Sequence, residues 1–148
     1  MALSNDRPIK QSRLQVQTDS KTLTEVLRWF EQFNQAPLSY DLWWQSQLAL
    51  TEGFTNAIRH AHQHLPPTTT IDIEVIVFSY YLEIRIWDRG GPFNLEEKLQ
   101  SICQEEYDPL EKEGGRGLLW MKQLTDELSY LRLADQRNCL VMRKIIRE

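Results

Sequence analysis

The sequence predicts an α+β fold, a two-layer sandwich with helices on one face of a mixed, mostly antiparallel sheet. Two helical patterns come early in the chain, two adjacent strand patterns follow in the middle, and a third helix and a hairpin complete it. The 148 residues suit one domain with a single core. We expect this domain to span residues 11–148, after a flexible tail of residues 1–10.

The composition is typical of a globular protein and argues against several functional classes. Apolar residues make up 41% and charged residues 26% of the chain, and the net charge is −4 without any Lys/Arg-rich run. A nucleic-acid-binding surface is therefore not expected. The start has no apolar signal core, and no apolar stretch approaches the length of a membrane span. Cys103 and Cys139 lie outside any CxxC motif and suit free thiols, so we expect a cytoplasmic protein without a membrane partner.

The first strand and the first helix are predicted from alternation and from a capping pattern. Apolar and polar residues alternate over residues 12–18, as in a half-buried strand. Thr22 and Glu25 have the spacing of a capping box, and apolar residues at helical spacing follow them. Pro37 closes this helix.

The second helix is expected to start near Ser39 or Asp41 and to run to about His62, before Pro66 and Pro67. One stripe of this helix is apolar and suits the core: Leu50, Phe54, Ala57 and Ala61. The opposite side carries three polar residues at four-residue spacing: Glu52, Asn56 and His60. Each step rises about 6 Å, so the Glu and Asn side chains can converge on one ligand.

The second half of the chain alternates strands with one helix. Strand patterns over residues 71–78 and 82–87 are joined by a short turn, and Asp88 follows directly. A helix is expected after Gly117, with Leu118, Leu119, Met121 and Leu124 buried. Strands over residues 128–133 and 139–146 are expected to form a hairpin about residues 135–138. The acidic segment 93–114, which holds Pro109 and only a short helical pattern, is predicted to be a mobile lid.

Three short segments carry side chains suited to a nucleotide site. Glu52 can accept a proton from a nucleophile beside a γ-phosphate, and the Asn56 amide oxygen can ligate Mg²⁺. Asp88 can accept a hydrogen bond from an exocyclic amino group, and Gly90 lets the backbone approach a base. The loop Gly114-Gly-Arg-Gly-Leu118 can offer backbone N–H groups to phosphate oxygens. Each segment alone also suits a solvated pair, a strand-ending turn or a flexible hinge.

Together these segments resemble the N, G1 and G2 boxes of the GHKL ATPases, which have the Bergerat fold. The matching residues are Glu52-x-x-x-Asn56-Ala-Ile-Arg-His60, Asp88-x-Gly90-x-Pro92-Phe93, and Gly115-x-Gly117-Leu118 followed by Asp126-Glu127. The pattern is most similar to the anti-sigma-factor serine/threonine kinases of bacterial partner-switching systems. The resemblance covers residues 10–147, and three boxes in this order are far more specific than any one of them.

The resemblance implies a role for each matched residue. Glu52 would be the catalytic base, Asn56 the Mg²⁺ ligand and Asp88 the residue that reads adenine. The nucleotide loops would be formed by Gly90, Gly114, Gly115, Gly117 and Leu118, with His60 supporting the site. The cofactors would be ATP or ADP with Mg²⁺. The partners would be a STAS-type anti-anti-sigma protein, whose serine is phosphorylated, a sigma factor or other target, and a second copy in a homodimer.

Two other functions remain to be weighed against a kinase. A nucleotide-binding interaction module would sequester partners without phosphoryl transfer, but it has no need of a general base such as Glu52. The catalytic domain of a histidine kinase would need an upstream phosphoacceptor hairpin, for which the residues before the second helix leave no room.

Several residues remain open to two interpretations. His60 and His64 have the spacing of a metal pair, but a third ligand is not evident, so a zinc site is not favoured. Trp44 and its neighbour Trp43 suit either the core or a partner surface. Gly53 costs about 1 kcal/mol in a helix interior relative to Ala, which tight packing at this position could explain.

Overall fold

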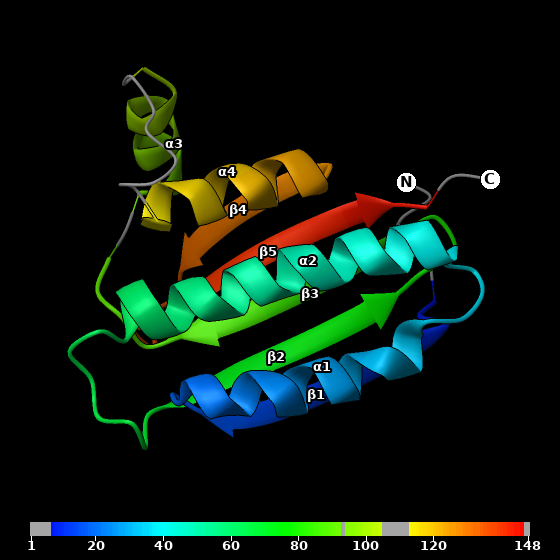
Figure 1. Cartoon of the computed structure of the whole chain (residues 1–148), viewed down its shortest axis with the longest axis horizontal. Coiled ribbons are helices and arrows are strands. Elements are labelled where there is room, and N and C mark those ends of the chain that lie inside the picture. Colours follow the sequence, from blue (N-terminus) through cyan, green and yellow to red (C-terminus); the bar gives the residue numbers. More distant parts are fainter. Residues whose placement is uncertain (1–6, 93, 105–112, 147–148) are drawn as a thin grey trace.

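The computed structural model describes residues 7–92, 94–104 and 113–146, and it shows helices on one face of a five-stranded sheet (Figure 1). The strands are β1 (Lys10–Gln17), β2 (Thr70–Val77), β3 (Tyr81–Asp88), β4 (Glu127–Arg132) and β5 (Asn138–Ile145). The α-helices are α1 (Leu23–Phe30), α2 (Tyr40–Asn56), α3 (Leu95–Gln104) and α4 (Glu113–Leu124). Two 3-10 turns, Ser20–Thr22 and Glu31–Phe33, flank α1, and a π-helical turn, Ala57–Ala61, extends α2.

The sheet has the strand order β1-β2-β3-β5-β4. Every pairing of neighbouring strands in the described sheet is antiparallel, so it is less mixed than the sequence suggested. The register opposes Ile73 to Ile86 and Asp88 to Asn138. All five strands lie within two residues of their predicted positions, and β1 begins at Lys10. Among the described helices, none is long and apolar enough to cross a membrane.

The core lies between the helices and the sheet face that they cover. The predicted stripe of α2 is confirmed, because Leu50, Phe54 and Ala57 are buried and Ala61 is half-buried. Full burial of a Leu or Phe side chain stabilises the folded state by about 1.5–3 kcal/mol. This stripe therefore determines which side of α2 faces the sheet. Helix α4 lies beside α2 and runs in the opposite direction (Figure 1).

At Gly53, helix α2 packs tightly against the sheet. A Cβ atom at this position would lie 2.8 Å from Ile86 Cδ1, 3.1 Å from Leu140 Cδ2 and 3.2 Å from Met142 Cε. Contacts below 3.4 Å require the neighbouring side chains to shift. The tight packing offered as an explanation for this glycine is therefore confirmed.

The entry to α1 differs from the predicted capping box. Thr22 already has helical backbone angles (φ −73°, ψ −11°), and its side chain makes no capping bond to the helix. Its hydroxyl instead donates to the carbonyl of Asp19 at 2.6 Å, because a 3-10 turn leads the chain into α1. The predicted start of α2 is confirmed: Ser39 is extended, and its Oγ accepts from the N–H of Leu42 at 3.1 Å.

The predicted lid contains α3. Leu95 and Leu99 of this helix are buried and belong to the hydrophobic core. Residues 93 and 105–112 of the same segment lie outside the described residues. For these residues the mobile lid stays a prediction. What the structure adds is an apolar attachment of α3 to the rest of the domain.

Candidate nucleotide-binding and catalytic site

The first and third segments lie side by side on neighbouring helices. Glu52 and Asn56 occupy the last turns of α2, one helical turn apart, and both are half-buried. Glu52 faces α4, because its Oε2 atom lies 3.0 Å from the place where a Cβ on Gly117 would be. The carboxylate therefore lies against a position that has no side chain of its own.

The glycine-rich segment is helical, which corrects the expectation of a loop before the third helix. Helix α4 begins at Glu113, so Gly114, Gly115 and Gly117 lie within it. The first turn of a helix has backbone N–H groups without intrahelical acceptors, so Gly114 and Gly115 still lie where phosphate oxygens can be bound. Leu118 is 3% exposed and belongs to the core, which it shares with Met121.

The carboxylate of Asp88 accepts hydrogen bonds from three sides at the end of β3. Oδ1 accepts from the Gly90 N–H and from Asn138 Nδ2, both at 2.9 Å. Oδ2 accepts from the Tyr130 hydroxyl at 2.5 Å. Burial and the bond to Asp88 raise the pKa of the Tyr130 phenol, which keeps it protonated as a donor. A carboxylate has about four lone-pair directions, so Oδ2 keeps one for a further donor.

The β4–β5 hairpin holds the turn after Asp88 in place. The Asn138 side chain is buried, and its Nδ2 atom also lies 3.0 Å from the Gly90 carbonyl oxygen and 3.1 Å from that of Gly91. Arg132 Nη1 donates to the same Gly90 oxygen at 2.8 Å. Tyr130, Arg132 and Asn138 are not among the residues that the sequence predicted for this site. The available signal was that Tyr130 and Arg132 share one face of β4 with Leu128, an apolar residue that packs against the core.

Gly90 joins the second segment to the end of α2. A Cβ at Gly90 would lie 2.6 Å from the carbonyl oxygen of Ala61 and 3.0 Å from its Cα, whereas a Cβ at Gly91 would meet nothing within 4 Å. The close approach of two backbones therefore requires glycine at position 90 and leaves position 91 free. With Gly117 beside Glu52, all three segments meet along the C-terminal part of α2 and its continuation.

His62 makes a second connection between α2 and the Asp88 turn. It is 2% exposed, and its Nε2 atom accepts from the backbone N–H of Arg89 at 2.7 Å. Its Nδ1 atom lies 2.7 Å from Thr18 Oγ1, whose own proton goes to the Thr69 carbonyl at 2.7 Å. Thr18 must then accept, so Nδ1 carries the proton and the imidazole is neutral. Burial lowers the pKa of His62; Asp88 raises it and Arg89 lowers it by smaller amounts.

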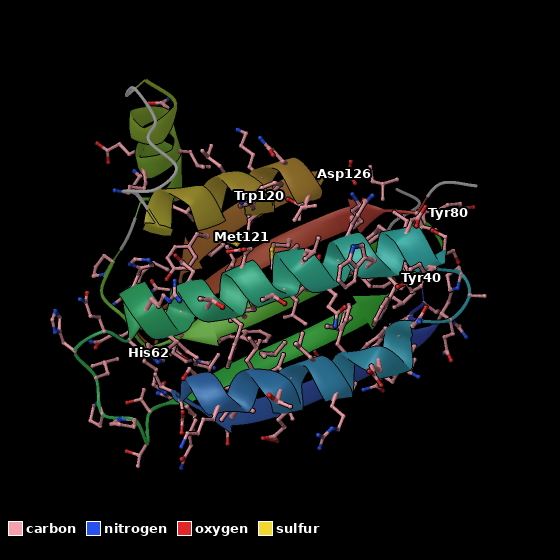
Figure 2. The ribbon with its side chains drawn as sticks, viewed as in Figure 1. Tyr40, His62, Tyr80, Trp120, Met121 and Asp126 are labelled. Atoms are coloured by element: carbon pink, nitrogen blue, oxygen red, sulfur yellow. The ribbon has the colours of Figure 1, made fainter. Side chains whose placement is uncertain are left out.

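His62, for which the sequence predicted no role, contacts the Asp88 turn, while the support of the site by His60 stays a prediction. His60 is exposed, while His62, which follows the π-helical turn (Figure 2), is buried and bonded to the Arg89 N–H. The π-helical turn explains this, because the His62 N–H bonds to the Ala57 carbonyl at 2.8 Å, five residues back. The extra residue in the turn rotates the following side chains relative to a regular helix.

A groove of about 530 Å³ borders the network around Asp88. One wall is formed by residues 128–132 of β4, and the other by Pro92, Asn94 and Leu95. Tyr130 and Arg132 both line it and both hold the Asp88 turn. The groove therefore provides space next to the two side chains that hold the Asp88 turn.

Metal binding at this site would depend on oxygen ligands from a substrate. The described residues contain no group of three or more His, Cys, Asp or Glu side chains that could hold a metal ion. Mg²⁺ needs no such cluster, because it keeps several waters and is bound through few protein groups and substrate phosphates. The half-buried amide of Asn56, one turn from Glu52, fits that donor set.

Comparison with known proteins agrees with this arrangement. A family model described as the histidine kinase-like ATPase domain matches residues 16–144. The serine-protein kinase RsbW of Listeria monocytogenes serovar 1/2a is 30% identical over 120 residues, which are 78% of this chain and 73% of that protein. The protein of the same name from Oceanobacillus iheyensis is 30% identical over 112 residues, 74% of this chain and 68% of that one.

A solved structure has the same fold. The RsbU and RsbW domains of Rv1364c from Mycobacterium tuberculosis match with a TM-score of 0.65 at 11% identity. The match covers 95% of this chain and 34% of that chain. At this identity the likeness concerns the fold alone, and this chain spans about a third of the solved one.

The fold and the site thus define an ATP-binding domain of the GHKL type, and the chain belongs to the histidine kinase-like ATPase family. Within that family it groups with the serine-protein kinases called RsbW, and it is accordingly a protein serine kinase.

Proposed function

We propose that this kinase transfers the γ-phosphoryl group of ATP to a serine of a STAS-type antagonist, and that it otherwise sequesters a sigma factor or a similar target in the cytoplasm. The observation that carries the enzymatic part is the position of Glu52. Its carboxylate is half-buried on α2 and lies against Gly117, in the segment suited to phosphate binding. The names of the RsbW relatives support the choice of serine as acceptor.

In the proposed reaction, Glu52 accepts the proton of the serine hydroxyl. The hydroxyl oxygen forms a bond to the γ-phosphorus, the bond from that phosphorus to the β–γ bridging oxygen breaks, and ADP leaves. The Asn56 amide oxygen would hold Mg²⁺, which supplies positive charge against the phosphate oxygens when it is bound. The N–H groups of Gly114 and Gly115 provide further donors to those oxygens.

Asp88 is the proposed reader of the adenine base. Its Oδ2 atom keeps one acceptor direction beside the Tyr130 hydroxyl, and Tyr130 itself lines the groove along β4. The hairpin residues Asn138 and Arg132 hold the Gly90 carbonyl, so the turn is fixed before any nucleotide arrives. A fixed acceptor favours an amino group at this position over a keto group.

The function is tested by phosphoryl transfer from radiolabelled ATP to purified STAS-domain proteins. Glu52→Gln keeps the size of the side chain and removes the base, so transfer should fall by roughly 10²–10⁴-fold while nucleotide affinity is retained. A wild-type protein that binds ATP, transfers nothing to any STAS protein and still retains a sigma factor would favour the rival interaction module. Transfer at the wild-type rate by the Gln variant would exclude Glu52 as the base.

A further inference from the structure

An apolar stripe faces solvent along the first half of α2. Tyr40, Trp44 and Leu48 are 63%, 47% and 38% exposed. They follow one another at four-residue spacing, which places them on one side of the helix. The same spacing continues to Glu52, so the stripe leads directly to the proposed base. We call these three residues the α2 stripe.

The α2 stripe differs from an ordinary solvated helix surface in its lack of charge. No residue between Asp41 and Glu52 is charged, although exposed helix positions usually carry Lys or Glu. The two adjacent tryptophans show the distinction. Trp43 is 6% exposed and its Nε1 donates to the Phe30 carbonyl at 3.2 Å, whereas Trp44 points outward. Trp43 is therefore part of the core, whereas Trp44 is not.

Helix α4 adds a fourth exposed apolar side chain beside the stripe. Trp120 is 47% exposed and lies one helical turn after Gly117 (Figure 2). Helix α4 runs antiparallel to α2, and Gly117 lies against Glu52. A residue one turn after Gly117 therefore lies at the same height as a residue one turn before Glu52. Trp120 is thus level with Leu48. Trp and Tyr are the residues most enriched at the energetic centres of protein interfaces.

We propose that the α2 stripe, together with Trp120, is the docking surface for the protein that receives the phosphoryl group. The occupant is an apolar patch of the STAS-type substrate next to its acceptor serine. Leu48 lies one helical turn from Glu52, a rise of about 6 Å, so a protein seated on the stripe presents a neighbouring hydroxyl to the carboxylate. The proposal rests on the proposed function, since it assigns the substrate's place at that site.

The position of the stripe disfavours a second copy of this chain as its occupant. A two-fold contact uses the same patch on both subunits, so it would lay one α2 helix across the other. Because Leu48 at the end of the stripe lies one helical turn from Glu52, a contact over the whole stripe would also cover the approach to the carboxylate on both copies. A kinase that acts on a protein needs this approach open, and the phosphoacceptor is therefore the occupant that fits.

The test compares the double variant Trp44→Gln, Leu48→Gln with wild type in steady-state transfer to a STAS protein that wild type phosphorylates. Both side chains are exposed, so nucleotide affinity and the unfolding midpoint should remain unchanged. The KM for the protein substrate should rise at least about tenfold, with kcat little altered, because truncation of interface anchors weakens docking. Tyr80→Ser is the matched control: Tyr80 is 69% exposed in the β2–β3 turn and is not part of the α2 stripe. Its KM should match wild type.

Three outcomes would overturn the proposal. An unchanged KM in the double variant would reject the stripe as the docking surface and leave the proposed function intact. A change from dimer to monomer by light scattering, with KM unaltered, would assign the stripe to a second copy. Failure of wild type to phosphorylate any STAS protein would reject both the proposed function and the docking surface. This outcome differs from the first one, in which wild type is active and only the effect of the double variant is missing.

Discussion

The Nε2 atom of His62 accepts a hydrogen bond from the backbone N–H of Arg89 at 2.7 Å, and this bond ties the end of the π-helical turn to the turn after β3. The contact requires a neutral imidazole with its proton on Nδ1. His62 is buried, so water cannot replace the bond if it is lost. Unpaired buried groups cost about 1–3 kcal/mol, which makes this contact a determinant of how the Asp88 turn is held.

Stability should decrease in mild acid because of His62. Burial holds its folded pKa below the ordinary value of 6.5, so its contribution is fully present above pH 6.5 and is lost as the pH falls toward the folded pKa. Urea unfolding at about pH 8 and about pH 5.5, on either side of the ordinary histidine pKa, measures the difference. His62→Gln keeps an acceptor and a donor but cannot titrate, so this variant should lose part of the pH dependence.

Gly90→Ala and Gly91→Ala should have opposite outcomes. The added methyl group at position 90 would lie 2.6 Å from the Ala61 carbonyl oxygen, and a backbone atom cannot move aside as a side chain can. We expect a loss of about 1–3 kcal/mol in stability and weaker ATP binding. At position 91 nothing lies within 4 Å, so the same change should be neutral in both measurements. Equal effects would show that the two backbones are not in contact.

Gly53→Ala should destabilise the protein although alanine favours helices. The gain in helix propensity is about 1 kcal/mol, while crowding in a packed core costs about 1–3 kcal/mol. Because the shortest contact, 2.8 Å, is to Ile86 Cδ1, the variant Ile86→Val removes that atom. Gly53→Ala should therefore cost less in the Ile86→Val background than in wild type. Additive effects in urea unfolding would contradict the proposed contact.

Asp88→Asn should weaken nucleotide binding. The charged acceptor for the amino group is lost, and this is worth on the order of 1.5–3 kcal/mol, or about ten- to hundredfold in affinity. Calorimetric titration with ATP and Mg²⁺ measures it. Asp126→Asn is the matched control, since Asp126 lies at the opposite end of the molecule from His62 (Figure 2), where its Oδ2 atom accepts from the Ile145 N–H. Wild-type affinity in Asp88→Asn would exclude Asp88 as the base reader.

Local patterns predicted the parts of the structure that local forces determine. The cap at Ser39, the buried stripe of Leu50 and Phe54, and the place of Asp88 at a strand end all depend on a few neighbouring residues. Helical periodicity also placed Glu52 and Asn56 on one side of α2. The GHKL family could accordingly be identified from three short segments.

Contacts between distant segments were beyond the reach of those patterns. Asn138 reaches Asp88 across 50 residues of chain because β3 and β5 pair in one particular register. Tyr130 meets the same carboxylate from the next strand. The capping box at Thr22 was wrong because a 3-10 turn, stabilised by Asp19, precedes α1. The contact of His62 with the Asp88 turn was not predicted, because it follows a π-helical turn that regular helical spacing does not include.

The π-helical turn at Ala57–Ala61 also affects how this chain must be aligned with others. A turn closed by five-residue bonds contains one residue more than an α-helical turn. Against a relative whose helix is regular, positional equivalence is preserved only if a single-residue gap is opened within this turn. Without that gap, each position from His62 to the start of β2 is compared with the neighbour of its true counterpart. A histidine with the same structural role as His62 would then be aligned with the residue next to His62 and would be missed.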